Sequence, residues 1–322
     1  MNFPNLNELR AAADIVHRTL APTPLIRWPL LCEHSGVSVW IKHENHSPVG
    51  AFKLRGGLVY MERLRREEPA VSAVITATRG NHGQSVAFAA ARAGLRAVIV
   101  VPHGNSREKN AAMRALGAEL RERGDDFQAA YEEAVRMAEA ESLHLVRSFH
   151  PALIAGVASY AWELFEAETF DAVYVPIGLG SGICGTIAVR DALGLKTEII
   201  GVVAAGAPAY ALSFEAGRPV ATESALTIAD GMACRTPVPE AVSAINRGAA
   251  RIVTVDDGEI RSAMRRFFSA THNTAEGAGA APLAALLKER DRMRGRRVAL
   301  ILSGGNVDRD VFARTLAEED RG

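Results

Sequence analysis

Apolar, β-branched runs recur along the chain and alternate with stretches of helical spacing. The runs that predict buried strands are residues 73–77, 97–101, 172–177, 198–203, 251–255 and 297–302. The stretches that predict helices are residues 84–93, 107–116, 126–140, 260–270 and 280–289. Parallel neighbours need a crossover, and a helix is the usual one. The alternation therefore predicts the α/β class, with mainly parallel sheets covered by helices on both faces.

Composition narrows the class of partner. With 322 residues, 48% of them hydrophobic, the chain is long enough for two lobes, each with its own core. Lys plus Arg and Asp plus Glu both number 37, so no basic excess favours nucleic acid or an anionic membrane surface. No apolar run approaches the roughly 20 residues of a membrane span. We expect neither nucleic acid nor membrane as a partner.

The N-terminus and the cysteines indicate the compartment. The first twenty residues lack the apolar core of a signal peptide and predict an ordinary helix capped near Asn5. Cys32, Cys184 and Cys234 are far apart, odd in number and in no CxxC pair, which is typical of a reducing compartment. We expect the protein in the cytoplasm.

The first candidate for chemistry is a lysine among small residues. Lys53 lies between Gly50 and the Gly56-Gly57 pair. A lysine can form a Schiff base with an aldehyde, and burial or a neighbouring cation such as Arg55 lowers its pKa. The alternative is a solvated lysine at the start of a helix, which is far commoner for a lone lysine.

The second candidate is the polar turn Thr76-Ala-Thr-Arg-Gly-Asn-His-Gly-Gln84, between a predicted strand and a predicted helix. Gly80 and the helix start would expose backbone N–H groups, which bind carboxylates and phosphates. Asn81 could donate a hydrogen bond to a ring oxygen. The alternative is a simple turn in which Thr78 caps the helix.

The third candidate is the glycine-rich segment 175–186, again between a strand and a helix. Gly180, Gly182 and Gly185 satisfy G-x-G-x-x-G, so a dinucleotide site is one interpretation. Such a site needs a carboxylate at the tip of the next strand, but Glu198 lies at that strand's beginning. A single phosphate therefore explains the loop better.

The fourth candidate is Ser303, which directly follows the apolar strand 297–302. Ligands gather at the carboxyl ends of strands in open α/β sheets. A serine hydroxyl at this place could meet a ring nitrogen, and a simple turn is the alternative.

Together these segments resemble fold-type II pyridoxal-phosphate (PLP) enzymes, specifically the threonine/serine dehydratase and serine racemase branch. The resemblance runs from about Thr23 to Asp308. The matching motifs are Lys42-His-Glu-Asn45, Ala51-Phe-Lys-Leu-Arg-Gly-Gly57, Gly80-Asn-His-Gly-Gln84, Thr227-Ile-Ala-Asp-Gly231 and Ser303-Gly-Gly-Asn-Val-Asp308.

The resemblance implies a tryptophan synthase β-like architecture, PLP as cofactor and a set of site residues. A small domain, residues 48–147, would be inserted into a large PLP-binding domain made of residues 1–47 and 148–322. Lys53 would hold PLP and later move the Cα proton. The residues expected to bind the cofactor are Phe52, Lys53, Asn81, Gly178, Leu179, Gly180, Ser181, Gly182, Glu276 and Ser303. Those expected to bind the substrate are Thr78, Arg79, Gly80, Asn81 and His82.

The activity implied is that of a PLP-dependent lyase. It would remove the β-hydroxyl of threonine or serine, or of a related amino acid, and give a 2-oxo acid and ammonia. The resemblance also implies a homodimer. Because the chain stops soon after Ser303 and leaves no room for the regulatory domain of biosynthetic threonine dehydratases, we expect a catabolic enzyme without isoleucine feedback. The alternatives are an NAD(P)-dependent oxidoreductase using the Gly180 to Gly185 loop, and a PLP-fold protein that binds without catalysing.

Two departures from the family pattern matter. Relatives show Ser-Ser or Ser-Ala where this chain has Thr78-Arg79, and in the racemase the second serine is the base on the opposite face of the cofactor. A guanidinium stays protonated and cannot be that base, so we expect no racemisation. Val203 and Ala209 stand where relatives have the acidic ligands of a divalent ion, so we expect no metal.

Arg79 also bears on the substrate. Its forked donors suit a second carboxylate, as in 3-hydroxyaspartate. The combination of His43-Glu-Asn-His46 with Thr78-Arg-Gly-Asn-His-Gly-Gln84 is similar to hydroxyectoine-utilisation dehydratases, which are thought to handle such compounds. The alternative is that Arg79 pairs with a protein carboxylate or points to solvent.

Overall fold

The computed structural model describes residues 4–319 and contains two β-sheets. The larger has the strand order β1-β2-β10-β7-β8-β9, and its neighbours are parallel except for the β1/β2 pair. The smaller has the order β5-β4-β3-β6 and is parallel throughout. The strands are β1 (Leu25–Arg27), β2 (Ser38–His43), β3 (Ala73–Ala77), β4 (Arg96–Val101), β5 (Glu119–Glu122), β6 (His144–Leu145), β7 (Ala172–Pro176), β8 (Glu198–Ala204), β9 (Arg251–Val255) and β10 (Arg297–Leu302).

Helices provide the crossovers between the parallel strands. They are α1 (Leu6–His17), α2 (Pro29–Ser35), α3 (Lys53–Glu67), α4 (Asn81–Arg92), α5 (Arg107–Ala115), α6 (Phe127–Ala140), α7 (Pro151–Ala167), α8 (Ser181–Ala192), α9 (Ala209–Ala216), α10 (Pro239–Gly248), α11 (Asp257–Thr271), α12 (Gly277–Lys288), α13 (Arg290–Met293) and α14 (Arg309–Ala317). Two short 3₁₀ helices are η1 (Glu44–His46) and η2 (Asp230–Met232).

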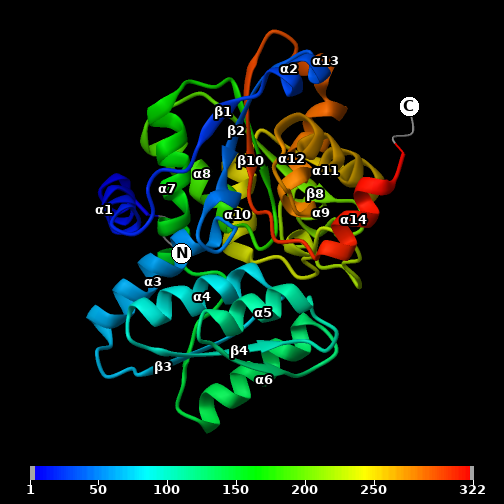
Figure 1. Cartoon of the computed structure of the whole chain (residues 1–322). Coiled ribbons are helices and arrows are strands. Elements are labelled where there is room, and N and C mark those ends of the chain that lie inside the picture. The colour runs from blue at the N-terminus through cyan, green and yellow to red at the C-terminus, as the bar shows by residue number, and fades with distance from the viewer. Residues whose placement is uncertain (1–3, 320–322) are drawn as a thin grey trace.

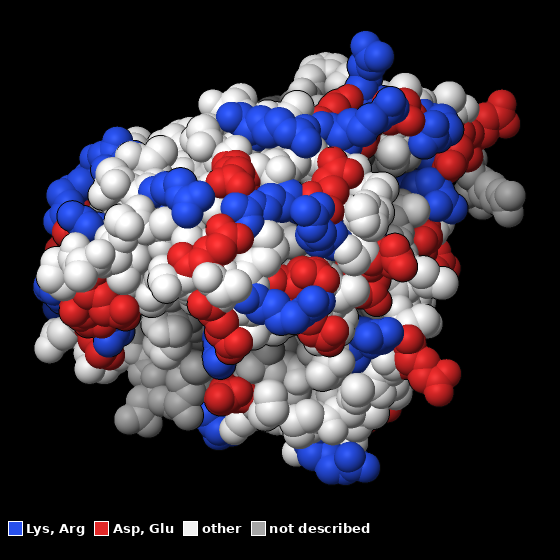
Figure 2. All heavy atoms as spheres, turned by 90° about the horizontal axis from the view of Figure 1, so that it is seen from below, with Lys and Arg blue, Asp and Glu red and all other residues white. Residues whose placement is uncertain are grey.

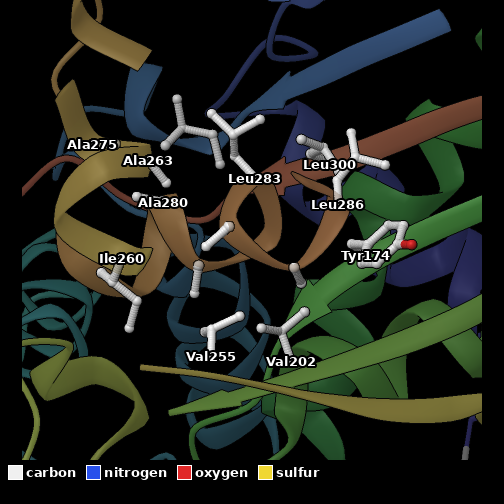
Figure 3. Packing of buried hydrophobic residues seen from close by; sticks show 14 of the residues in the cluster. Tyr174, Val202, Val255, Ile260, Ala263, Ala275, Ala280, Leu283, Leu286 and Leu300 are labelled. Atoms are coloured by element: carbon white, nitrogen blue, oxygen red, sulfur yellow. The ribbon is translucent and has the colours of Figure 1, made fainter. Parts of the chain in front are cut away.

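The larger sheet is buried on both faces. Side chains alternate along a strand, so Tyr174 of β7 joins the core on one face and Val173 the core on the other. Helices α11 and α12 cover the first face, where Leu283 and Leu286 approach Val202 and Leu300 (Figure 3). Helices α7, α8 and α10 cover the second face. Two buried faces make the strands continuous apolar runs, which is why the sequence revealed them.

The smaller sheet forms a second lobe with its own core. Helices α3 and α4 pack on one face and α6 on the other, and Figure 1 shows α4, α5 and α6 around β3 and β4 in the lower part of the molecule. All four strands fall within residues 73–145. This supports the predicted division into a small domain, residues 48–147, and a flanking large domain, which remains a proposal.

The predicted class and elements agree with the structure. All six predicted strands and all five predicted helices are present, with ends that differ by a few residues, and Asn5 caps α1. Within residues 4–319 no helix is long and apolar enough to cross a membrane. Figure 2 shows basic and acidic side chains interspersed on the face seen from below, without a large field of one sign.

Candidate active site

A cavity of about 430 Å³ opens where three strand-to-helix loops converge. These loops follow the carboxyl ends of β3, β7 and β10, which are the ends where ligands bind in parallel sheets. Every residue predicted from the sequence to bind cofactor or substrate lines this cavity. The structure therefore brings the candidate residues together, although they are up to 251 positions apart, from Phe52 to Ser303.

Lys53 begins α3 and reaches across to the glycine-rich loop. Its Nζ donates a hydrogen bond to Ser181 Oγ at 3.0 Å and lies 4.9 Å from the centre of the Phe52 ring. The side chain is half-buried beside the cavity, and the surrounding protein lowers the pKa of the amine to about 8 by desolvation. This amine can therefore lose its proton near neutral pH, as a nucleophile or base must.

Arg55 does not have the role that the sequence suggested. Its guanidinium is completely buried and forms ion pairs with Glu44 and Glu163 at 2.6 and 2.5 Å. Its charge is therefore balanced within this cluster, and burial is the cause of the lowered pKa of Lys53. The prediction of Arg55 as the perturbing cation was wrong because a sequence does not show the two carboxylates that neutralise it.

The glycine-rich loop enters α8 without a side-chain cap. Gly180 is the N-cap with φ of +97°, a conformation that favours glycine. The first N–H groups of α8 have no partner within the helix, and Ser181 and Gly182 line the cavity. A Cβ on Gly178 would overlap the Gly231 carbonyl oxygen, and one on Gly182 would come within 3.3 Å of the Tyr160 hydroxyl. The loop is therefore a cradle of backbone donors for an anion.

The loop conformation is fixed by two buried tyrosines. Tyr160 donates to the Gly182 carbonyl and Tyr210 to the Leu179 carbonyl, both at 2.9 Å. Burial raises the pKa of both phenols well above 10, so they remain donors. The carbonyls are thus held away from the cavity, where they would repel an anion.

Asn81 and Glu276 are joined across the cavity. Asn81 Nδ2 donates to Glu276 Oε1 at 2.6 Å, and Asn306 Nδ2 donates to Asn81 Oδ1 at 2.9 Å. Lys109 Nζ lies 3.4 Å from Glu276 and 2.7 Å from Asp230. Burial opposes the charge of Lys109, but these two carboxylates outweigh it and raise its pKa. Lys109 therefore carries a fixed positive charge.

The turn after β3 is ordered by Thr78. The Thr78 hydroxyl accepts from the N–H groups of Gly80 and Gly83 at 2.9 and 3.2 Å, so it acts as a cap although Gly80 is the N-cap of α4. Among the described residues, the N–H groups of Asn81 and His82 have no such partner. These groups, rather than that of Gly80 itself, are available for a carboxylate.

His82 is buried in the same turn and lies 3.1 Å from Thr76 Oγ1 through Nε2. Burial, reinforced by the charge of Lys53, lowers its pKa to about 3. Its ring is therefore neutral at physiological pH and does not compete with Lys53 for an anion.

Arg79 is exposed and lines the cavity. Within residues 4–319 its guanidinium has neither an ion pair nor a hydrogen bond. The first alternative to a substrate contact, pairing with a protein carboxylate, is therefore not what the structure contains. The forked donor is open to a ligand or to water.

Ser303 completes a site that fits PLP. The residue is buried, its carbonyl accepts from Phe52 N at 3.0 Å, and its hydroxyl lines the cavity without a protein partner in the described chain. PLP has an aldehyde that can react with the Lys53 amine and a phosphate that can accept hydrogen bonds from the N–H groups of the loop before α8. Its pyridine nitrogen can bond to the Ser303 hydroxyl, and all three protein groups lie in one cavity. The residues present therefore fit the expected cofactor.

Part of the site escaped the sequence analysis. Lys109, Asp230 and Arg235 also line the cavity. Asp230 belongs to a motif that matched the family, so it could have been selected, but no local pattern shows that Lys109 or Arg235 faces inward.

Residues 4–319 contain no group of three or more His, Cys, Asp or Glu residues that could hold a metal ion. The absence of a metal remains a prediction.

The dinucleotide interpretation finds no support in the site. Glu198 lies at the amino end of β8 and pairs with Arg251 and Arg296 at 2.8 and 2.9 Å. It is therefore committed to a surface network at the opposite end of the sheet from the glycine-rich loop.

Comparison with known proteins agrees with this geometry. The family model described as "Pyridoxal-phosphate dependent enzyme" matches residues 16–304. The L-threonine ammonia-lyase of Thermotoga maritima is 33% identical over 309 residues, which is 95% of this chain and 76% of that protein. The chain spans 56% to 58% of the length of some longer relatives, which are biosynthetic L-threonine dehydratases.

Solved structures have the same fold. The processed form of threonine deaminase isoform 2 from Solanum lycopersicum superposes with a TM-score of 0.90 at 30% identity, covering 98% of this chain and 95% of that chain. A PLP-dependent aspartate racemase superposes with a TM-score of 0.90 at 26% identity, covering 96% and 98%.

Proposed function

The chain belongs to the family of pyridoxal-phosphate-dependent enzymes and is a lyase of the threonine dehydratase type, and we propose that 3-hydroxyaspartate is its preferred substrate. Threonine and serine are the poorer substrates in this proposal. The observation that carries it is the unpaired guanidinium of Arg79 in the cavity. A similar fold in the aspartate racemase accommodates an amino acid with a side-chain carboxylate, which adds support. We further propose that the protein is one of the hydroxyectoine-utilisation dehydratases.

We assign the following roles to the residues that would hold PLP. Lys53 would bind its aldehyde, and Phe52 would pack beside that amine. The loop from Gly178 to Gly182 would bind the phosphate, Asn81 and Glu276 would lie beside the ring, and Ser303 would meet the ring nitrogen. When bound, PLP supplies an electron sink that stabilises negative charge at the substrate Cα.

The chain's own residues then direct the elimination. The N–H groups of the Gly80 to His82 turn would hold the α-carboxylate, with the charge of Lys109 nearby, and Thr78 would keep that turn in place. Arg79 would bind the second carboxylate. Lys53 Nζ, with its pKa of about 8, would take the Cα proton, and one proton delivered to the β-hydroxyl would let it leave as water, so that the substrate loses one H and one OH. Addition of one water would then release a 2-oxo acid and ammonia.

Serine at the ring nitrogen favours this outcome. The neutral Ser303 hydroxyl would leave the ring nitrogen unprotonated, whereas a carboxylate at this place would favour its protonation. Arg79 also supplies no base for returning a proton from the opposite face. Elimination is therefore favoured over racemisation.

A substrate panel tests the proposal. Purified holoenzyme is given L-threonine, L-serine, both 3-hydroxyaspartate diastereomers and phenylserine, and 2-oxo acid and ammonia are measured. We expect kcat/KM to be highest for one 3-hydroxyaspartate diastereomer. Threonine as the best substrate would refute the acidic preference, and no ammonia from any substrate would favour a binding protein without catalysis.

Two further points belong to the proposal. We propose a homodimer, because members of the family that this chain resembles form dimers. Light scattering during size-exclusion chromatography tests this proposal.

We also propose a reducing, cytoplasmic environment, which is supported by the three free cysteines, of which Cys184 and Cys234 are buried. Mass spectrometry of thiols labelled in lysed cells would reveal an oxidised pair if this were wrong.

A further inference from the structure

We infer that Arg235 is a second specificity-determining residue, which binds the side-chain carboxylate of the substrate together with Arg79. This inference rests on the proposed function and assigns a role to a residue that neither the motifs nor the sequence patterns selected. Its basis is the distribution of charge in the cavity.

Arg235 is a cation without a counterion. The residue is exposed at the cavity, and its side chain makes one hydrogen bond among the described residues, from Nη1 to the Glu223 carbonyl at 3.4 Å. In the described chain it forms no ion pair, even with the nearby Glu223 carboxylate. A long hydrogen bond to a neutral carbonyl oxygen leaves most N–H donors of the guanidinium group free.

The other cations of the cavity are already committed. Lys109 is shared between the carboxylates of Asp230 and Glu276, and Lys53 is the amine expected to hold the cofactor. The exposed Glu223 carboxylate also lines the cavity. Asp126 caps α6 by accepting from Ala129 N at 2.8 Å. Arg79 and Arg235 are therefore the two cavity-lining cations that remain for a ligand. Two guanidinium groups favour a ligand with more than one negative charge.

The two arginines come from different lobes. Arg79 follows β3 in the smaller sheet, whereas Arg235 follows η2, which packs on α12 of the larger lobe. A substrate held by both would connect the lobes. Threonine, with a methyl group in place of the carboxylate, cannot make either contact and leaves both guanidinium groups in water.

The backbone around Arg235 is held independently of its side chain. The Arg235 carbonyl accepts from Thr222 N at 2.9 Å, and Leu226 N donates to the Gly206 carbonyl at 2.9 Å. Thr227 and Ile228 bond to the Asp257 carboxylate through Oγ1 and N. Truncating the Arg235 side chain therefore leaves these bonds in place, so a folded variant is expected.

The test compares Arg235→Ala and Arg235→Lys with Arg79→Ala in the holoenzyme. Arg218→Ala is the matched control, because Arg218 is exposed near the same segment but does not line the cavity. KM and kcat are measured for 3-hydroxyaspartate and threonine through ammonia release. Succinate and butyrate, which differ by one carboxylate, are compared as inhibitors of threonine turnover.

We expect Arg235→Ala to raise KM for 3-hydroxyaspartate about tenfold or more, the effect of losing a charge-assisted hydrogen bond. KM for threonine should change less than about twofold, since no such bond is lost. Inhibition by succinate should weaken in parallel, inhibition by butyrate should not, and Arg235→Lys should recover only part of the loss because lysine lacks the fork. Arg218→Ala should resemble the wild type.

Two results would overturn the inference while leaving the proposed function intact. One is an equal rise of KM for both substrates, or no rise for either, in an enzyme that prefers 3-hydroxyaspartate. The other is a rise of KM in Arg218→Ala as large as that in Arg235→Ala, which would indicate a long-range electrostatic effect rather than a direct contact with the substrate. If the wild type used threonine but not 3-hydroxyaspartate, the proposed substrate itself would be refuted, independently of the role of Arg235.

Discussion

Arg55→Met should destabilise the protein strongly at neutral pH and weakly at pH 5. Arg55 bonds to both oxygens of Glu44, at 2.6 and 2.9 Å, and Glu44 is fully buried. Without Arg55, the single charge of Lys42, which lies 2.5 Å from Glu163 and also acts on Glu44, faces two carboxylates. Among the described residues, Glu44 then keeps only the Thr23 hydroxyl, at 2.6 Å, as a hydrogen-bond partner. Glu44 must remain a buried anion without an ion pair of its own or take up a proton.

The size of the loss follows from that choice. Protonating an ordinary glutamate costs about 4 kcal/mol at pH 7 and about 1 kcal/mol at pH 5. The first figure agrees with the roughly 3–5 kcal/mol that breaking a buried ion pair typically costs. We therefore expect the free energy of unfolding to fall by about 4 kcal/mol at pH 7 and by far less at pH 5.

Urea unfolding of the apoprotein, followed by circular dichroism at both pH values, measures the difference without the contribution of a bound cofactor. The double variant Arg55→Met/Glu44→Gln is the control, because its neutral amide needs no proton and should recover much of the loss at pH 7. A loss below about 1 kcal/mol at pH 7, or one equal at both pH values, would refute the reasoning.

The other predictions concern the cofactor cradle and Lys53. Gly178→Ala should weaken PLP binding by about tenfold or more, because its Cβ would overlap the Gly231 carbonyl oxygen. Fluorescence titration of the apoprotein with PLP measures the affinity. An unchanged affinity would contradict the assignment of this loop as the phosphate-binding site. In the apoprotein, the folded pKa of Lys53, about 8, lies below its ordinary 10.5, so the folded state binds fewer protons than the unfolded state between these values. Stability should therefore rise with pH through this window, by at most about 3 kcal/mol, and Lys53→Met should abolish that rise; a rise that persists in Lys53→Met would place its origin elsewhere.

The sequence predicted the elements whose signal is local. Strand β7 lies in the middle of a doubly covered sheet, so its apolar run is continuous. Strand β2 was missed because it ends in Lys42 and His43, which are buried only because distant residues such as Glu163 and Trp28 bond to them. Helix α7 was missed because it is apolar on nearly every side and shows no helical period.

The same limit applies to the site. Lys53 was selected because small residues surround it. Asn81, the glycine-rich loop and Ser303 were selected because each follows a predicted strand, and the carboxyl ends of parallel strands lie at one edge of a sheet. Lys109 was placed within a predicted helix, but its role depends on Asp230 and Glu276, which are more than 100 positions away. The neutralisation of Arg55 by Glu44 and Glu163 depends on contacts of the same long-range kind.

The central claim is that the amine at position 53 holds PLP. Borohydride treatment of the holoenzyme, followed by peptide mass spectrometry, tests it most directly. We predict loss of the visible absorbance band and a reduced pyridoxyl phosphate on Lys53, with neither the band nor the adduct in Lys53→Ala. A label on Lys109 or on another lysine, with Lys53 unmodified, would contradict the assignment.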